Sequence, residues 1–127
     1  PVFLVDGAHN EDGANALAKS LKEYFPNKKF HMIVGILADK AYDKMLETML
    51  PFAKEVYCVT PQNPRALEAK ELEKIICRMP FHIETHCCDN LEEALRQAYF
   101  DTKEDALAFG SLYYVGRIRK LFLDIDR

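Results

Sequence analysis

The segment Asp6-Gly7-Ala8-His9-Asn10 places a carboxylate, an imidazole and an amide on one short turn. It follows an apolar run and precedes a helical pattern. Such strand-to-helix turns are where open α/β sheets bind ligands, because side chains and unpaired helix N–H groups face a crevice at the carboxyl ends of the strands. We therefore expect Asp6, His9 and Asn10 to face a polar ligand.

Three further polar stretches follow later apolar runs, namely Asp39-Lys40, the loop 60–65 that ends in Arg65, and Gly110-Ser111. They add an ammonium, a guanidinium, a hydroxyl and a second carboxylate to the first turn. Guanidinium and helix N–H groups favour carboxylate or phosphate. The collection fits an anionic ligand with hydroxyls, such as a nucleotide or an amino acid.

Each of these residues also has a purely structural explanation. Asp and Asn between a strand and a helix commonly cap the helix, and so does Ser. An exposed ion pair contributes about 1 kcal/mol or less. The structural alternatives are helix caps at Asp6, Asn10 and Ser111, a surface pair of Asp39 with Lys40, and a helix start at Pro64-Arg65.

The elements that must position these residues alternate along the chain. Short runs rich in β-branched and aromatic residues predict strands at 2–5, 30–36, 55–60, 82–87 and 106–109. Apolar residues at helical spacing predict helices within 14–25, 45–50, 72–79, 91–99 and 115–122. Asn10 and Asn90, the latter with Glu93, are expected N-caps. Pro26, Pro51 and Pro80 fall just beyond expected helix ends.

Strict alternation of apolar strands with helices predicts an α/β fold, a Rossmann-like, mostly parallel sheet with helices on both faces. Such a sheet gathers its strand-to-helix turns along one edge. The four polar stretches should therefore converge there. The chain has 127 residues, 49% of them hydrophobic, which fits one domain with a single core.

Composition narrows the partners. The net charge of −3 has no block of one sign, so we expect neither a nucleic-acid partner nor a membrane partner. No apolar run approaches the ~20 residues of a membrane span. The four cysteines show no paired spacing, which favours a reducing cytoplasm.

Several common metal-binding and catalytic motifs are absent from the sequence. His82, His86, Cys87 and Cys88 cluster in the sequence, but adjacent cysteines on a strand point to opposite faces and no C-x-x-C accompanies them, so no metal site is predicted. The sequence contains no P-loop pattern, no dinucleotide fingerprint and no hydrolase elbow.

Four motifs in order carry a resemblance to a known family. D-G-A-H-N at 6–10, D-K at 39–40, N-P-R-A-L at 63–67 and G-S-L-Y at 110–113 resemble the C-terminal domain of folylpolyglutamate synthase, also called dihydrofolate synthase, in the Mur ligase superfamily. The resemblance spans essentially the whole chain. Glu11 stands where that family often has proline, and Ala41 where it often has an acid.

The resemblance implies that residues 1–127 are the glutamate ligase domain of an ATP-dependent amide ligase. In that family ATP phosphorylates a folate carboxylate, and the amino group of glutamate attacks the acyl phosphate. The P-loop, the Mg²⁺ ligands and the pocket for folate or dihydropteroate belong to an N-terminal domain that this chain lacks. We therefore expect the chain alone to fold but to be catalytically inactive.

The resemblance also suggests roles for single residues. It matches Asp6 and Asn10 to nucleotide contacts, and it places His9, the catalytic candidate, with Ser111 beside the incoming amino acid. Arg65 resembles an arginine that holds a carboxylate of the added amino acid in a related ligase. Asp39 and Lys40 are possible further contacts.

Two other functions remain open from the sequence. One is another Mur-type ligase, such as a cell-wall peptide or cyanophycin enzyme, although N-P-R-A-L and G-S-L-Y favour the folate branch. The other is a non-catalytic α/β binding module that kept the fold.

Overall fold

The computed structural model describes residues 1–111 and 115–126 of the chain. Its regular elements alternate between strands and helices. In chain order they are β1 (Phe3–Asp6), α1 (Glu11–Tyr24), β2 (Phe30–Gly35), α2 (Tyr42–Met49), the 3₁₀ turn η1 (Leu50–Phe52), β3 (Ala53–Cys58), α3 (Ala69–Arg78), β4 (Glu84–Cys87), α4 (Leu91–Leu95), the π turn η2 (Arg96–Phe100), β5 (Ala106–Gly110) and α5 (Val115–Asp126).

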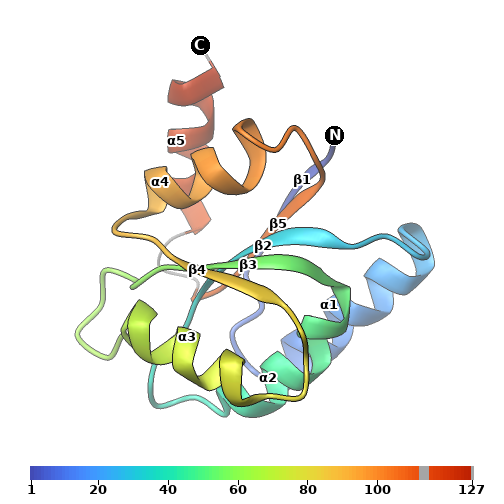
Figure 1. Cartoon of the computed structure of the whole chain (residues 1–127), viewed down its shortest axis with the longest axis vertical. Coiled ribbons are helices and arrows are strands. Elements are labelled where there is room, and N and C mark those ends of the chain that lie inside the picture. The colour runs from blue at the N-terminus through green and yellow to red at the C-terminus, as the bar shows by residue number, and fades with distance from the viewer. Residues whose placement is uncertain (112–114, 127) are drawn as a thin grey trace.

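The strands form one sheet in the order β1-β5-β2-β3-β4 (Figure 1). All four strand pairings are parallel. The predicted α/β fold is thus confirmed, and the sheet described is wholly parallel. The last strand, β5, lies between β1 and β2, so the first and the last strand of the chain are neighbours in the sheet.

Helices cover both faces of the sheet. In Figure 1, α1, α2 and α3 lie on one side, and α4 and α5 on the other. Adjacent residues of β2 face opposite ways, with Met32 packed among α1 to α3 and Ile33 packed against α4 and α5. Every residue of β2 is buried. A strand covered on both faces reads as a nearly continuous apolar run. The single core expected from length is therefore two cores, one on each side of the sheet.

Local signals place the helix ends. The side chain of Asn10 accepts a hydrogen bond from the Gly13 amide at 2.8 Å, and Asn90 accepts one from Glu93 at 2.8 Å. Both predicted N-caps are confirmed. The carboxylate of Glu93 accepts a hydrogen bond at 3.2 Å from the amide of Asp89, and not from the amide of Asn90 as in a capping box.

Several element boundaries differ from the prediction by one or two residues, and three differences are informative. β3 begins at Ala53, before the predicted start, because Ala53 pairs with Phe30 even though Ala and Lys are poor strand formers. β4 begins at Glu84, because this edge strand pairs with β3 only from Glu84 onward, and His82 lies outside it. The fourth helix ends in the π turn η2.

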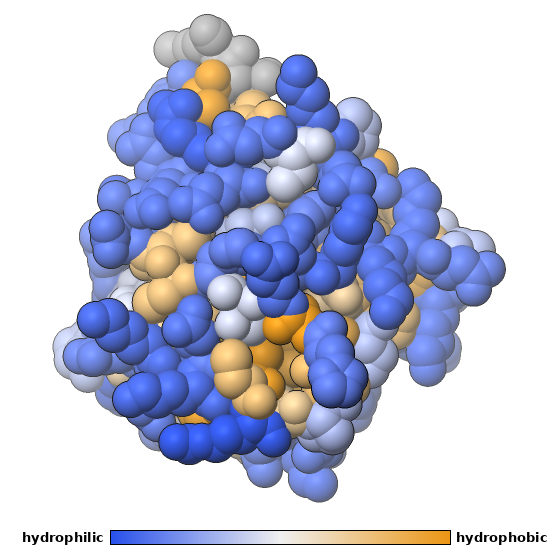
Figure 2. Space-filling view, viewed as in Figure 1, coloured by the Kyte–Doolittle hydropathy of each residue, from blue (hydrophilic) through white to orange (hydrophobic). Residues whose placement is uncertain are grey.

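Hydrophilic side chains cover most of the face seen in Figure 2, and the apolar patches on it are small. Among the described residues, no helix combines the length and apolar character needed to cross a lipid bilayer. The apolar residues serve the two sides of the sheet instead.

Asp105 ties the start of the chain to the sheet. Its carboxylate accepts a bond from the Val2 amide at 2.7 Å and pairs with Lys28 Nζ at 3.0 Å. The Val2 hydrogen bond first, and the Lys28 hydrogen bond second, hold the pKa of Asp105 below its usual value. Together these bonds align β1 beside β5.

We predict that Asp105→Asn destabilises the chain by about 0.5–1.5 kcal/mol at pH 7, because two charge-assisted hydrogen bonds weaken. A lowered folded-state pKa stabilises the fold above the unfolded pKa of ~3.9, and this stabilisation is lost as the pH falls through the folded value. Urea unfolding at pH 7 and pH 2.5 should show a gap between the two proteins that closes at low pH. Glu23→Gln, an exposed change in α1, should open no such gap. A gap that persisted at pH 2.5 would contradict the assignment.

Candidate functional site

The carboxyl ends of the strands lie in one row. Asp6 of β1 is paired with Phe109 of β5, Phe109 with Val34 of β2, and Val34 with Cys58 of β3. Neighbouring parallel strands are ~4.8 Å apart, so the row from β1 to β3 spans roughly 14 Å. The predicted convergence of four polar stretches on one edge is thereby confirmed. The span is of the order of a nucleotide or an amino acid.

The row contains a topological switch point at β5. The chain leaves β1 and β2 toward α1 and α2 on one face, but it leaves β5, which lies between them, toward α5 on the other face. Ligands of open α/β sheets bind where connections diverge in this way. A small pocket at this point is lined by His9, Lys40 and Ser111 together with apolar side chains, and it is closed, with no free volume for a water molecule.

The first turn is held by its own hydrogen bonds. Asp6 Oδ1 accepts from the Ala8 amide at 2.9 Å, and His9 Nδ1 lies 3.1 Å from the Gly7 carbonyl oxygen. A carbonyl only accepts, so His9 Nδ1 carries the proton in this bond. In the neutral ring the lone pair is then on Nε2, which can accept a proton or a hydrogen bond from a ligand.

Asn10 has a structural role that leaves room for a second one. Its Oδ1 caps α1 through the Gly13 amide. The side-chain amide also carries two N–H donors, which capping does not use. Gly13 fits closely here, since a Cβ on it would come within 3.2 Å of Ala8 Cα. Capping by Asn10 and contact with a ligand are therefore compatible.

The loops after β2 and β3 are joined to each other. Leu37 and Ala66 form an antiparallel bridge, the Ala38 amide donates to the Arg65 carbonyl at 2.7 Å, and the Leu67 amide donates to the Ile36 carbonyl at 2.8 Å. These backbone bonds hold the loop that carries Arg65 over the loop that carries Asp39 and Lys40.

Arg65 pairs with Asp39, with Nη1 2.8 Å from Oδ2. The expected surface pair of Asp39 with Lys40 is therefore wrong, because the bridged loops bring the guanidinium to Asp39 while Lys40 lines the pocket. The suggested helix start at Arg65 is also wrong, since α3 begins at Ala69. Both partners are about half exposed, so the pair adds little stability. The guanidinium can exchange Asp39 for a ligand carboxylate at low cost.

Ser111 reaches the pocket through a turn that needs glycine. Its side chain is buried, with 2% exposed, and its amide donates to the Gly35 carbonyl at 2.9 Å. Gly110 precedes it with φ of 127°, a conformation that disfavours a side chain. Ser111 was expected to cap the next helix, and Leu112 and Tyr113 complete the G-S-L-Y motif. Both expectations concern residues 112–114, which lie outside the described residues.

A second switch point lies between β3, which leads to α3, and β4, which leads to α4 on the other face. The pocket there has a volume of about 220 Å³ and is lined in part by Thr60, Gln62, Asn90 and Arg117. Thr60 is already used by α3, because its hydroxyl accepts from the Ala69 amide at 2.9 Å. The sequence analysis missed Arg117. The position of Arg117 near the start of the last helix could have indicated that it faces this edge of the sheet.

The fold and the site define a class of protein, a parallel α/β domain with a polar ligand crevice at its switch point. Comparisons with known proteins narrow that class. The sequence model of the family described as Mur ligase, glutamate ligase domain, matches residues 1–109. The chain belongs to this family.

Relatives agree with the match. Folylpolyglutamate synthase of Lacticaseibacillus casei is 35% identical over 125 residues, which are 97% of this chain and 27% of that protein. Mycobacterium tuberculosis folylpolyglutamate synthase, solved with ADP and AMPPCP, superposes with a TM-score of 0.86 at 26% identity over 96% of this chain and 30% of that one.

A bifunctional folylpolyglutamate synthase/dihydrofolate synthase with Mn, AMPPNP and L-glutamate bound gives a TM-score of 0.80 at 26% identity, covering 97% of this chain and 29% of that one. The chain thus spans under a third of the length of these relatives. The sequence-based resemblance to the folate branch of the superfamily is confirmed.

We predict that Gly110→Ala destabilises the fold by about 1–3 kcal/mol, because alanine is strained at this φ. Gly116→Ala is the matched control. Gly116 is in exposed helix, and a Cβ there would have no heavy atom within 4 Å, so this change should stabilise by about 0.5–1 kcal/mol. Urea unfolding measures both. Equal stabilities of the two variants would show that the turn before Ser111 does not require glycine.

Proposed function

We propose that this chain is the glutamate ligase domain, residues 1–127, of an enzyme that uses ATP to join glutamate to folate or dihydropteroate. The observation that carries the proposal is the pocket at the β5 switch point. There His9, Lys40 and Ser111, which come from three loops, line one small closed pocket, in a domain of the Mur ligase glutamate ligase family. The relatives named above are folylpolyglutamate or dihydrofolate synthases, which favours this activity over the other Mur-type ligases.

The reaction joins a carboxylate to an amine. A carboxylate is a poor electrophile until phosphoryl transfer from ATP gives it a good leaving group. The glutamate nitrogen then attacks the acyl carbon, the amide forms and inorganic phosphate leaves. The domain's share of this work is to hold the amine within reach of the acyl phosphate.

His9 is the proposed catalytic residue. The ammonium of glutamate must lose a proton before its nitrogen can attack. His9 donates from Nδ1 to the Gly7 carbonyl, and this bond directs the lone pair of the neutral ring to Nε2. Nε2 accepts the proton at the rim of the pocket, as a general base does.

The proposed glutamate site takes its charges from neighbouring loops. Lys40 and Ser111 line the pocket, so an ammonium and a hydroxyl are available to a substrate at this rim. Arg65 leaves Asp39 to hold a substrate carboxylate through paired hydrogen bonds. Asp39 then serves to hold Arg65 in place while no substrate is bound.

The proposed nucleotide contacts are on the first turn. Asp6 uses one oxygen for the Ala8 amide and has acceptor capacity left for ribose hydroxyls, and Asn10 has two N–H donors left. Bound ATP supplies the phosphoryl group that activates the carboxylate.

Among the described residues, the one group of three possible metal ligands is away from this rim. We therefore place the Mg²⁺ ligands, the P-loop and the folate pocket on an N-terminal domain of the same protein. Two relatives solved with nucleotide, one of them with Mn, support a nucleotide and a divalent ion in the family.

We also propose that the protein works in the cytoplasm. All four cysteines are unpaired, two of them exposed. Exposed free thiols are typical of proteins in a reducing compartment, where disulfides are rare.

We predict that the chain alone unfolds cooperatively but forms no glutamate amide. Fused in place of the matching C-terminal segment of the Lacticaseibacillus casei enzyme, it should restore ATP-dependent incorporation of labelled glutamate. His9→Ala in the fusion should lower kcat ~10²–10⁴-fold, the usual contribution of a general base. Amide formation by the unfused chain, or an active His9→Ala fusion, would refute the division of labour proposed here.

We predict that Arg65→Ala in the same fusion raises KM for glutamate roughly 10–100-fold, the loss of about 1.4–3 kcal/mol from a charge-assisted pair. KM for ATP should change little. Arg96→Ala removes an exposed arginine that pairs with Glu92 on α4 and should leave both constants unchanged. Steady-state kinetics with each substrate varied in turn will separate the cases. An equal rise in both KM values would assign Arg65 to structure.

A further inference from the structure

A cluster of metal-ligating side chains lies on the sheet away from the switch-point pocket. Glu55 of β3 is directly opposite Glu84 of β4, and His86 follows two residues later on the same face. One ligand atom from each of these three residues lies within 4.8 Å of the other two. The carboxylates and the imidazole thus share one small region.

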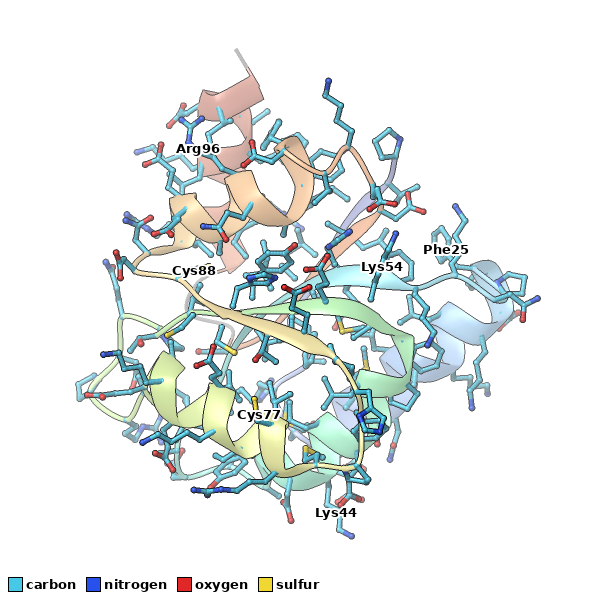
Figure 3. All side chains as sticks on the ribbon, in the orientation of Figure 1. Phe25, Lys44, Lys54, Cys77, Cys88 and Arg96 are labelled. Carbon is cyan, nitrogen blue, oxygen red and sulfur yellow. The ribbon has the colours of Figure 1, made fainter. Side chains whose placement is uncertain are left out.

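The position of this cluster separates it from the proposed ligase site. Glu55 and Glu84 lie near the starts of their strands, whereas the ligase site lies beyond the ends. Tyr57 lies two residues after Glu55 on the same face of β3, and it packs in the core on the α4 side of the sheet. The cluster is therefore on the α4 side. Figure 3 shows Cys77 on α3, across the sheet from α4.

Charge makes this arrangement costly without a cation. Like charges directly opposite on neighbouring strands destabilise a sheet. Among the described residues, Glu55 has only histidines as ionic partners and Glu84 has no cationic partner. The nearby Lys54 pairs with Glu104 instead, at 2.6 Å.

The cluster is held in place before any ion arrives. His86 Nε2 is 2.8 Å from Glu55 Oε1, and the His86 ring stacks on Tyr57 with centroids 4.7 Å apart and planes 16° apart. Stacking fixes the ring plane, and hydrogen bonds around ligating groups orient them for a metal.

A buried histidine lies behind Glu55. His31, only 1% exposed, donates from Nε2 to Glu104 at 2.9 Å, and its Nδ1 lies 3.0 Å from Tyr57 Oη and 3.5 Å from Glu55 Oε2. Burial, and next the charge of Glu55, raise the pKa of Tyr57, so its hydroxyl keeps the proton and donates to Nδ1. In this state His31 has no proton left to donate to Glu55, whose carboxylate is bonded by His86.

We propose that Glu55, Glu84 and His86 bind a zinc ion. One imidazole nitrogen and two carboxylate oxygens suit zinc, which takes a water as fourth ligand in sites with three protein ligands. Zinc bonds of ~2.0–2.2 Å require the three ligand atoms to approach to roughly 3.5 Å of one another. Glu84 is exposed on an edge strand and can make that movement. Zinc takes the place on Nε2 of the proton that His86 now shares with Glu55, and the neutral ring then carries its proton on Nδ1.

The test uses the chain after treatment with EDTA and dialysis, in a Cys77→Ser/Cys87→Ser background, because both thiols are exposed and could bind zinc themselves. Isothermal titration with ZnCl₂ should give one site per chain. At a hundredfold excess over Kd the melting temperature should rise by roughly 5–10 °C. Co²⁺ should give the visible absorption of a bound ion.

Two variants and a control decide the matter. Glu84→Gln and His86→Gln should each weaken zinc binding at least about 100-fold and abolish the thermal shift. His82→Gln removes an exposed histidine just before the same strand and should change neither. Absence of saturable binding would overturn the proposal, and so would an unchanged affinity in Glu84→Gln, an exposed position where loss of folding is not expected to interfere.

Discussion

The parallel alignment of the strands is the constraint on which the rest of this structure depends. Asp6, Phe109, Val34 and Cys58 lie in one row at or next to the last residues of their strands, so the strand-to-helix turns begin at the same edge. Because β5 pairs with both β1 and β2, the turn that carries His9 and the turn that carries Ser111 become neighbours. Polar groups far apart in the chain meet without a dedicated binding element.

The sequence predicted the elements because their signals are local, but it did not predict the strand order. Apolar runs and caps such as Asn10 and Asn90 mark strands and helices within a few residues. The insertion of β5 depends on pairings such as Phe3 with Ala106, for which no local pattern exists. The predicted start of β3 was wrong for the same reason, since Ala53 joins β3 only because Phe30 lies beside it.

The candidate site follows the same division. Residue types at the strand ends indicated which side chains face the crevice, and the structure gathers His9, Lys40 and Ser111 there. The partner of Asp39 was not predictable, because the backbone bridge of Leu37 with Ala66 brings Arg65 to it from another loop. The cluster around Glu55 was hidden for a similar reason, as it exists only across two paired strands.

The two buried polar side chains among the described residues mark the two ends of the sheet. Ser111 lies beyond β5 at the carboxyl edge, and His31 lies at the start of β2. Burying a polar group costs free energy unless the group is hydrogen-bonded, and among the described residues no buried side-chain nitrogen or oxygen lacks a partner. Ser111 lines the pocket with His9, whereas His31 donates to Glu104 and accepts from Tyr57. The two buried polar residues therefore belong to separate parts of one sheet, with Ser111 beside the proposed ligand pocket at the carboxyl edge and His31 inside a hydrogen-bonded network near the amino edge.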